Sequence, residues 1–120
     1  MANILVVDDE LSLRKLIKTN LVASGYKVTT AKSGEDGLKQ AQRAKPDLIL
    51  TDIKMPGISG WDMLTRLGAI LDLKQTPIIM MTAFPRENEE NRAQKVAADF
   101  IVKPFSVSEL LSKVKRALGE

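Results

Sequence analysis

Five short apolar runs, each followed by a segment of helical periodicity, constrain the fold of this 120-residue chain more than any other feature. Continuous runs of Val, Ile and Leu are typical of strands buried on both faces, and such strands occur in parallel sheets. The run from Lys27 to Ala31 is more polar, as an edge strand would be. The expected strands comprise residues 4–7, 27–31, 48–50, 78–81 and 100–102.

Helices are expected after these strands, because apolar residues recur there every three or four positions. Ser33, Ser59 and Ser106 are expected to cap three of the helices, and Ser106 is predicted to form a capping box with Glu109. The helix expected at 86–96 has a thin apolar face. The expected helices comprise residues 13–25, 33–45, 59–71, 86–96 and 106–118.

Strands that alternate with helices in this way predict an α/β fold, with a parallel sheet covered by helices on both faces. Right-handed crossovers leave few topologies for such a sheet. We expect one domain over residues 1–120 with the flavodoxin-like strand order 2-1-3-4-5, which places the polar strand at an edge. In that order a crevice opens between the first and third strands, beyond their carboxyl ends.

The composition excludes several classes of function. The chain has no cysteine, which excludes disulfides, thiolate zinc sites and cysteine nucleophiles, and no histidine, which excludes Ser-His-Asp hydrolysis. No run approaches the roughly 18 apolar residues of a membrane span, so we expect no membrane association. The first residues, MANILVVDDE, lack the basic region of a signal peptide, and a cytoplasmic location is therefore expected.

The net charge of +3 is small, and the basic residues are scattered along the chain. A modest group near the C-terminus, formed by Lys113, Lys115 and Arg116, is more typical of a solvated helix face than of a nucleic-acid site. We therefore expect no direct binding of nucleic acid by this domain.

Charged and hydroxyl side chains follow four of the five expected strands. Asp8 and Asp9 follow the first, Asp52 follows the third, Thr82 follows the fourth and Lys103 follows the fifth. The carboxyl ends of parallel strands meet at one edge of the sheet, so these side chains should lie close together. Three carboxylates in a small space repel one another unless a hard divalent cation neutralises them, and a lysine beside that cation can bind an anion. This arrangement suits the transfer of a phosphoryl group to an aspartate.

The motifs that carry these side chains resemble the receiver domain of bacterial two-component response regulators. The resemblance covers essentially the whole chain, and its motifs occur in the order typical of that family. They are Val6-Val7-Asp8-Asp9, Asp52 with Met55-Pro56-Gly57 and Gly60, Thr82-Ala83, and Phe100-Ile101-Val102-Lys103-Pro104-Phe105.

The resemblance implies a phosphoacceptor with a Mg²⁺ site. Asp52 would accept a phosphoryl group from a sensor histidine kinase, a phosphotransfer protein or a small donor such as acetyl phosphate. Asp9 and Asp52 would bind Mg²⁺ directly, Asp8 would act through a water, and the backbone carbonyl of Lys54 would be a further ligand. Lys103 would pair with a phosphoryl oxygen, and its bond to Pro104 is expected to be cis.

The resemblance also implies a conformational switch, in a protein that assists its own phosphorylation and dephosphorylation but is not an enzyme. Thr82 would move to bond the phosphoryl group, and Phe100 would turn inward into the space that Thr82 leaves. The output surface would be the helix at 86–96, the fifth strand and the last helix, and its partner is unknown. The expected oligomeric state is a monomer or a weak dimer, in which Asp99, Glu109 and Lys113 could take part.

Two other functions stay open. A phosphatase of the haloacid-dehalogenase type also uses an aspartyl nucleophile and Mg²⁺, but it needs a second aspartate two residues later, where this chain has Lys54. A receiver-shaped binding module that is never phosphorylated would have no need of the complete set of site residues. Lys54 and Phe84 would flank the phosphoryl group and obstruct hydrolytic water, which predicts slow loss of the phosphoryl group.

Overall fold

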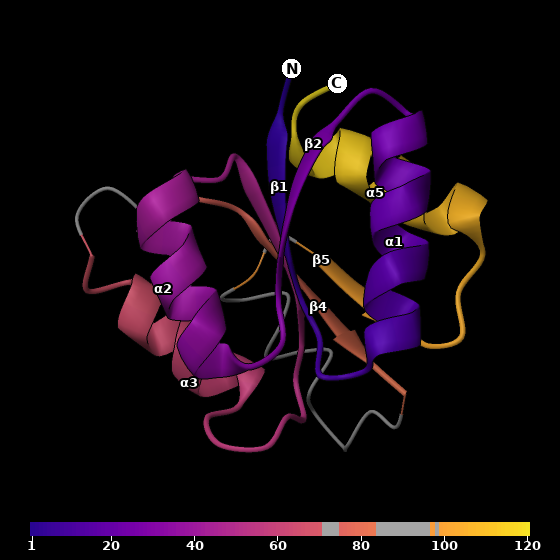
Figure 1. The fold of residues 1–120 in the computed structure, drawn as a ribbon. Helices are drawn as coiled ribbons and strands as arrows, with labels where there is room; N and C mark the ends of the chain where they lie inside the picture. The colour runs from indigo at the N-terminus through magenta and orange to yellow at the C-terminus, as the bar shows by residue number, and fades with distance from the viewer. Residues whose placement is uncertain (71–74, 84–96, 98) are drawn as a thin grey trace.

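The fold is a five-stranded parallel sheet between two layers of helices (Figure 1). A computed structural model describes residues 1–70, 75–83, 97 and 99–120. The strands lie in the order β2-β1-β3-β4-β5, and every neighbouring pair is parallel, which confirms the predicted fold class and order. The strands are β1 (Asn3–Val7), β2 (Lys27–Ala31), β3 (Leu48–Asp52), β4 (Ile78–Thr82) and β5 (Asp99–Val102).

The described helices form two pairs, one on each face of the sheet. Figure 1 shows α2 and α3 on one side, and α1 and α5 on the other. The helix expected at 86–96 lies outside the described residues. The helices are α1 (Leu11–Ala23), α2 (Gly34–Ala44), α3 (Gly60–Leu67) and α5 (Val107–Ala117), with labels as in the figure.

Helix boundaries follow the predicted capping signals at three helices. The side chains of Ser33, Ser59 and Ser106 each accept a hydrogen bond from the backbone N–H three residues later. The third helix is shorter than expected, because α3 ends at Leu67 and Gly68 caps it, whereas the apolar spacing predicted a helix to residue 71. The spacing of apolar residues gives no signal for this helix end, and residue 71 itself lies outside the described part of the chain.

Alternate residues of the central strands face two separate cores, which is why these strands have no polar face. Leu5 and Val7 of β1 pack in the core beneath α2 and α3, whereas Ile4 and Val6 pack in the core beneath α1 and α5. All four of these side chains are fully buried. Full burial of an aliphatic side chain contributes roughly 1.5–3 kcal/mol to folding, so these side chains stabilise the packing of both helical layers on the sheet.

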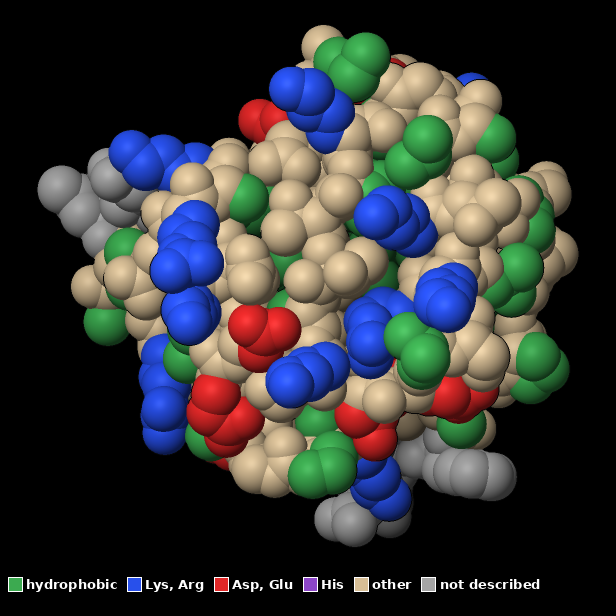
Figure 2. Space-filling view, in the orientation of Figure 1, with side chains coloured by type: hydrophobic (Ala, Val, Ile, Leu, Met, Phe, Trp, Pro, Cys, Tyr) green, Lys and Arg blue, Asp and Glu red, His purple; other side chains and the backbone are tan. Residues whose placement is uncertain are grey.

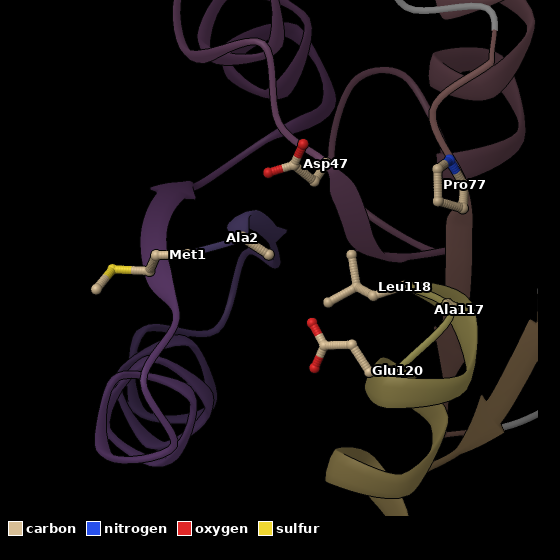
Figure 3. Close-up of a pocket in the computed structure, with 7 residues that line it drawn as sticks. All are labelled: Met1, Ala2, Asp47, Pro77, Ala117, Leu118 and Glu120. Carbon is tan, nitrogen blue, oxygen red and sulfur yellow. The ribbon is translucent and has the colours of Figure 1, made fainter.

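The two ends of the sheet differ in character. The chain termini and a hollow of about 510 Å³ lie at the amino ends of the strands, where Met1, Pro77 and Glu120 are among the residues that line it (Figures 1 and 3). At the same end, the Tyr26 hydroxyl donates a 2.8 Å hydrogen bond to a Glu120 carboxylate oxygen. Among the described residues, no helix has the combined length and hydropathy needed to span a membrane.

Candidate functional site

The predicted site residues gather at the carboxyl ends of the strands. In the register of β1 and β3, Val7 lies beside Thr51, so the residues that come next, Asp8 and Asp52, are also neighbours. Thr82 is the last residue of β4, and Lys103 follows β5 directly. The strand order therefore places these residues at one end of the sheet, and the long side chain of Lys103 reaches Asp8, which is 95 positions away in the chain.

Three carboxylates form the acidic part of the site. Asp8, Asp9 and Asp52 each offer an oxygen, and these oxygens lie within 4.8 Å of one another. Asp8 is fully buried and Asp52 is 8% exposed, whereas Asp9 is exposed to solvent. An all-oxygen cluster that is open on one side suits a hard cation such as Mg²⁺, which retains several of its waters.

The ammonium group of Lys103 bridges two of these carboxylates. Its Nζ atom donates to Asp8 Oδ2 at 2.7 Å and to Asp52 Oδ2 at 2.9 Å. Burial by itself would lower the pKa of Lys103, but the bonds to Asp8 and then Asp52 outweigh burial, and the pKa of Lys103 is raised. The lysine therefore stays charged and offsets part of the negative charge of the site.

Burial has a different outcome for the pKa of Asp52 than for that of Lys103. Burial is the largest influence and raises the pKa of Asp52, despite the opposing hydrogen bond and charge of Lys103, while the charge of Asp8 raises it further. The ionised form of Asp52 is therefore poorly compensated by the protein alone. A cation that joins the cluster would stabilise that form, which is consistent with a site built to hold one.

Backbone contacts fix the position of Asp52. The N–H of the following residue, Ile53, donates to Met81 O at 3.0 Å, and the N–H of Gly60 donates to Ile53 O at 2.8 Å. A Cβ atom at Gly60 would lie only 2.4 Å from the carbonyl oxygen of Asp52, so no larger residue fits there without a shift of the backbone. The start of α3 is thus packed directly against the phosphoacceptor candidate.

One side chain at the site was not predicted from the sequence. Arg14 of α1 donates from Nη1 to the backbone carbonyl of Asp8 at 2.7 Å, and the N–H of Glu10 donates to Asp8 Oδ1 at 2.9 Å. Together they hold the turn between β1 and α1. An arginine near the start of an amphipathic helix usually faces solvent, so the sequence carries no signal that Arg14 would bond the backbone of Asp8.

The other predicted residues are placed as follows. The Lys103–Pro104 peptide bond is cis, as expected. Thr82 is 2% exposed and its carbonyl accepts the Lys103 N–H at 2.8 Å. Phe100 is 6% exposed and packs in the core beneath α2 and α3, so inward movement of its ring stays a prediction. Lys54 is exposed, and Phe84 lies outside the described residues.

Two of the three charges expected at a dimer interface, Asp99 and Lys113, are paired with each other within the chain. Asp99 bonds Lys113 Nζ at 3.1 Å and Arg116 Nη2 at 2.8 Å. Burial alone would raise the pKa of Asp99, but the Phe100 N–H and then the two cations outweigh it, and the pKa is lowered. Dimerisation through these residues stays a prediction.

The comparisons with known proteins agree with this geometry. The family model of the response regulator receiver domain matches residues 4–115. The chain belongs to this receiver domain family. Its sequence is 39% identical, over 119 residues, to the phosphate regulon transcriptional regulatory protein PhoB of Rhizobium meliloti. That match covers 98% of the chain and 52% of PhoB, so the receiver domain spans about half the length of this relative.

Solved receiver domains share the fold closely. The chemotaxis protein CheY4 of Vibrio cholerae superposes with a TM-score of 0.92 at 34% identity, covering 98% of this chain and 99% of that one. The response regulator TrrA of Thermotoga maritima, in complex with Mg²⁺-BeF, has a TM-score of 0.86 at 38% identity and covers 98% and 100%. Both likenesses extend over essentially the whole receiver domain.

Receiver domains are phosphoacceptor signalling switches of two-component systems and not enzymes in the ordinary sense. The acidic cluster and the adjacent lysine fit that role in this receiver domain. Neither of the two alternative functions gains support from the family match or from the structural neighbours.

The basic side chains are spread across the face that carries α1, β2 and α2, and form no single patch there (Figure 2).

Proposed function

We propose that Asp52 is the residue of this receiver domain that accepts the phosphoryl group. The observation that carries the proposal is the Lys103 bridge to Asp8 and Asp52, at 2.7 and 2.9 Å, beside the exposed carboxylate of Asp9. This arrangement supports the proposal, because phosphoryl transfer to an aspartate would need a carboxylate, a fixed cation and oxygen ligands for a second cation at one end of the sheet.

In the proposed reaction a carboxylate oxygen of Asp52 attacks phosphorus and forms an acyl phosphate. The bond that breaks is the P–N bond of a phosphohistidine, or the P–O bond of a small donor such as acetyl phosphate. Asp9 and Asp52, with Asp8 through a water and the Lys54 carbonyl, would hold Mg²⁺. When bound, Mg²⁺ would neutralise charge that develops on the phosphoryl oxygens.

Lys103 is suited to bind the transferred group. An ammonium group has three donors, and in the described residues two of them bond Asp8 and Asp52. The third is available to a phosphoryl oxygen, and a charge-assisted bond to that oxygen would be stronger than a neutral one. Lys103 thus serves the unmodified site as a counter-ion and the modified site as an anchor.

The switch belongs to the same proposal. Phosphorylation replaces the single negative charge of the Asp52 carboxylate with a charge of about −1.5 to −2 and adds three acceptor oxygens, to one of which the hydroxyl of Thr82 would move to bond. Phe100 would follow, and the output surface would include β5 and α5. We propose that residues 1–120 form a single receiver domain, which is a monomer or a weak dimer in the cytoplasm. Its partners would be a sensor kinase or phosphotransfer protein and an output protein or domain. The receiver domain itself would not contact nucleic acid.

Treatment with acetyl phosphate and Mg²⁺ tests the proposal. Intact-protein mass spectrometry should show a gain of about 80 Da, the mass of one phosphoryl group. Asp52→Asn should abolish the gain, whereas Asp47→Asn, at the opposite end of the sheet, should leave it unchanged. Chelation of Mg²⁺ should also abolish it. A wild-type protein that gains no mass from this donor or from a phosphorylated histidine kinase would instead be a receiver-shaped binding module.

A further inference from the structure

We propose that Glu35 is a positioning residue for the metal site, because it anchors the β3–α3 loop (residues 53–59) that carries the Lys54 carbonyl. This inference rests on the proposed Mg²⁺ site. It assigns a role in that site to a residue that lies on the surface of α2, on a different element from every proposed ligand.

The β3–α3 loop is held firmly at its base and lightly at its tip. At the base, Ile53 and Gly60 are joined to each other and to β4 by the backbone bonds described above. The tip is more open, since Lys54, Pro56 and Gly57 are exposed. Within the described part of the chain, the hydrogen bond that ties this tip to another element runs from the N–H of Ile58 to Glu35 Oε1, at 2.9 Å.

The backbone at two glycines lies close to the partners of this contact. Gly57 has a φ of +82°, and a Cβ atom there would lie 2.4 Å from Glu35 Oε1. A Cβ atom at Gly34 would lie 2.4 Å from the Ile58 side chain. Two glycines thus permit the loop and the start of α2 to approach one another closely enough for the bond to form.

A carboxylate suits this place for an electrostatic reason. The N–H of Ile58 is the largest influence on Glu35 and lowers the pKa of its carboxyl group, and the backbone N–H of Glu35 itself acts in the same direction. Glu35 therefore accepts the bond as an anion at neutral pH, and hydrogen bonds to ions are stronger than neutral ones.

The consequence concerns metal affinity. Lys54 lies four residues before Ile58, and its carbonyl is the one proposed ligand that comes from the exposed part of the loop. If the tip were released, this carbonyl would have to be ordered again each time Mg²⁺ binds. Loss of a residue that orients a metal ligand weakens affinity by about 10- to 100-fold in known sites, and we expect about tenfold for Glu35→Ala.

Isothermal titration with Mg²⁺ at neutral pH, combined with amide hydrogen exchange at Ile58, tests the proposal. Glu35→Ala should bind Mg²⁺ about tenfold more weakly and lose protection at the Ile58 amide. Glu35→Gln keeps an oxygen acceptor and should recover part of both, because its neutral bond to the Ile58 N–H is weaker than the bond to a carboxylate. Glu109→Ala is the matched control, because it removes an acid from the first turn of α5, which lies on the opposite face of the sheet from α2 and α3 (Figure 1).

The outcomes separate the two proposals. Unchanged Mg²⁺ affinity in Glu35→Ala, with normal binding by the wild type, would overturn the role of Glu35 and leave the metal site intact. Equal weakening in Glu35→Gln and Glu35→Ala, or in Glu109→Ala, would also overturn it, since charge or helix stability would then be responsible. A wild type that binds no Mg²⁺ would overturn both.

Discussion

Lys103→Met should destabilise the protein by leaving two buried carboxylates without their cation. The side chains of Asp8 and Asp52 are 0% and 12% exposed, and both are bonded to Lys103 in the wild type. Removing one partner of a buried ion pair costs about 3–5 kcal/mol. We expect about 3 kcal/mol, the lower end of that range, because the exposed side of the cluster admits water.

The loss should depend on pH in a definite direction. Burial already raises the pKa of Asp52, and removal of Lys103 should raise it further. A carboxyl group with a raised pKa in the folded state destabilises that state as the pH rises through the raised value. The penalty should therefore grow as the pH rises above about 4, the ordinary pKa of an aspartate, and be largely absent well below that pH, where Asp52 is protonated in the folded and the unfolded protein.

Urea unfolding followed by Trp61 fluorescence, at several pH values and with or without Mg²⁺, measures these effects. Saturating Mg²⁺ should recover more stability in Lys103→Met than in the wild type, because carboxylates that lack their ammonium partner should bind the cation more tightly. Stabilisation by a ligand grows as Kd falls, and reaches about 2.7 kcal/mol at 100 times Kd. Lys18→Met, which removes an exposed lysine from α1, is the control. Equal stability of Lys103→Met and the wild type at neutral pH without Mg²⁺ would refute the reasoning.

Three further substitutions test contacts at the site and elsewhere in the domain. Gly60→Ala should cost about 1–3 kcal/mol in unfolding experiments, since its Cβ would overlap the phosphoacceptor's carbonyl oxygen, whereas Gly68→Ala, with 3.4 Å to its nearest neighbour, should be nearly neutral. Asp99→Asn should lose about 1 kcal/mol at neutral pH through its partly buried pair with Lys113. Because the pKa of Asp99 is lowered, the wild type loses this contribution as the pH falls through that value, and the two stability curves should converge in acid. Lys54→Asn should speed loss of the phosphoryl group about fivefold, equivalent to about 1 kcal/mol of barrier, and an unchanged decay rate would argue against shielding by this side chain.

The sequence by itself determined the layers, the strand order and the edge at which the site lies. Continuous apolar runs such as the one before Asp8 are typical of strands buried between two helical layers, and right-handed crossovers then leave few orders for the strands. The carboxyl ends of parallel strands lie at one end of the sheet, so the sequence predicts that Asp8, Asp52 and Lys103 lie at that end. The capping serines were equally legible, because each bonds a backbone group only three residues away.

Contacts between elements were decided by the tertiary structure alone. The bonds from Arg14 to the Asp8 carbonyl and from Ile58 to Glu35 depend on how helices and loops pack, and neither pair follows a repeating spacing. The same holds for the two hydrogen bonds that Lys103 donates to Asp8 and Asp52. It also holds for the raised pKa of Asp52, which depends on burial. A local sequence pattern predicts the secondary structure and caps of its own segment, but not its contacts with distant segments. The charge balance of the site arises only when the packed elements exclude water from it.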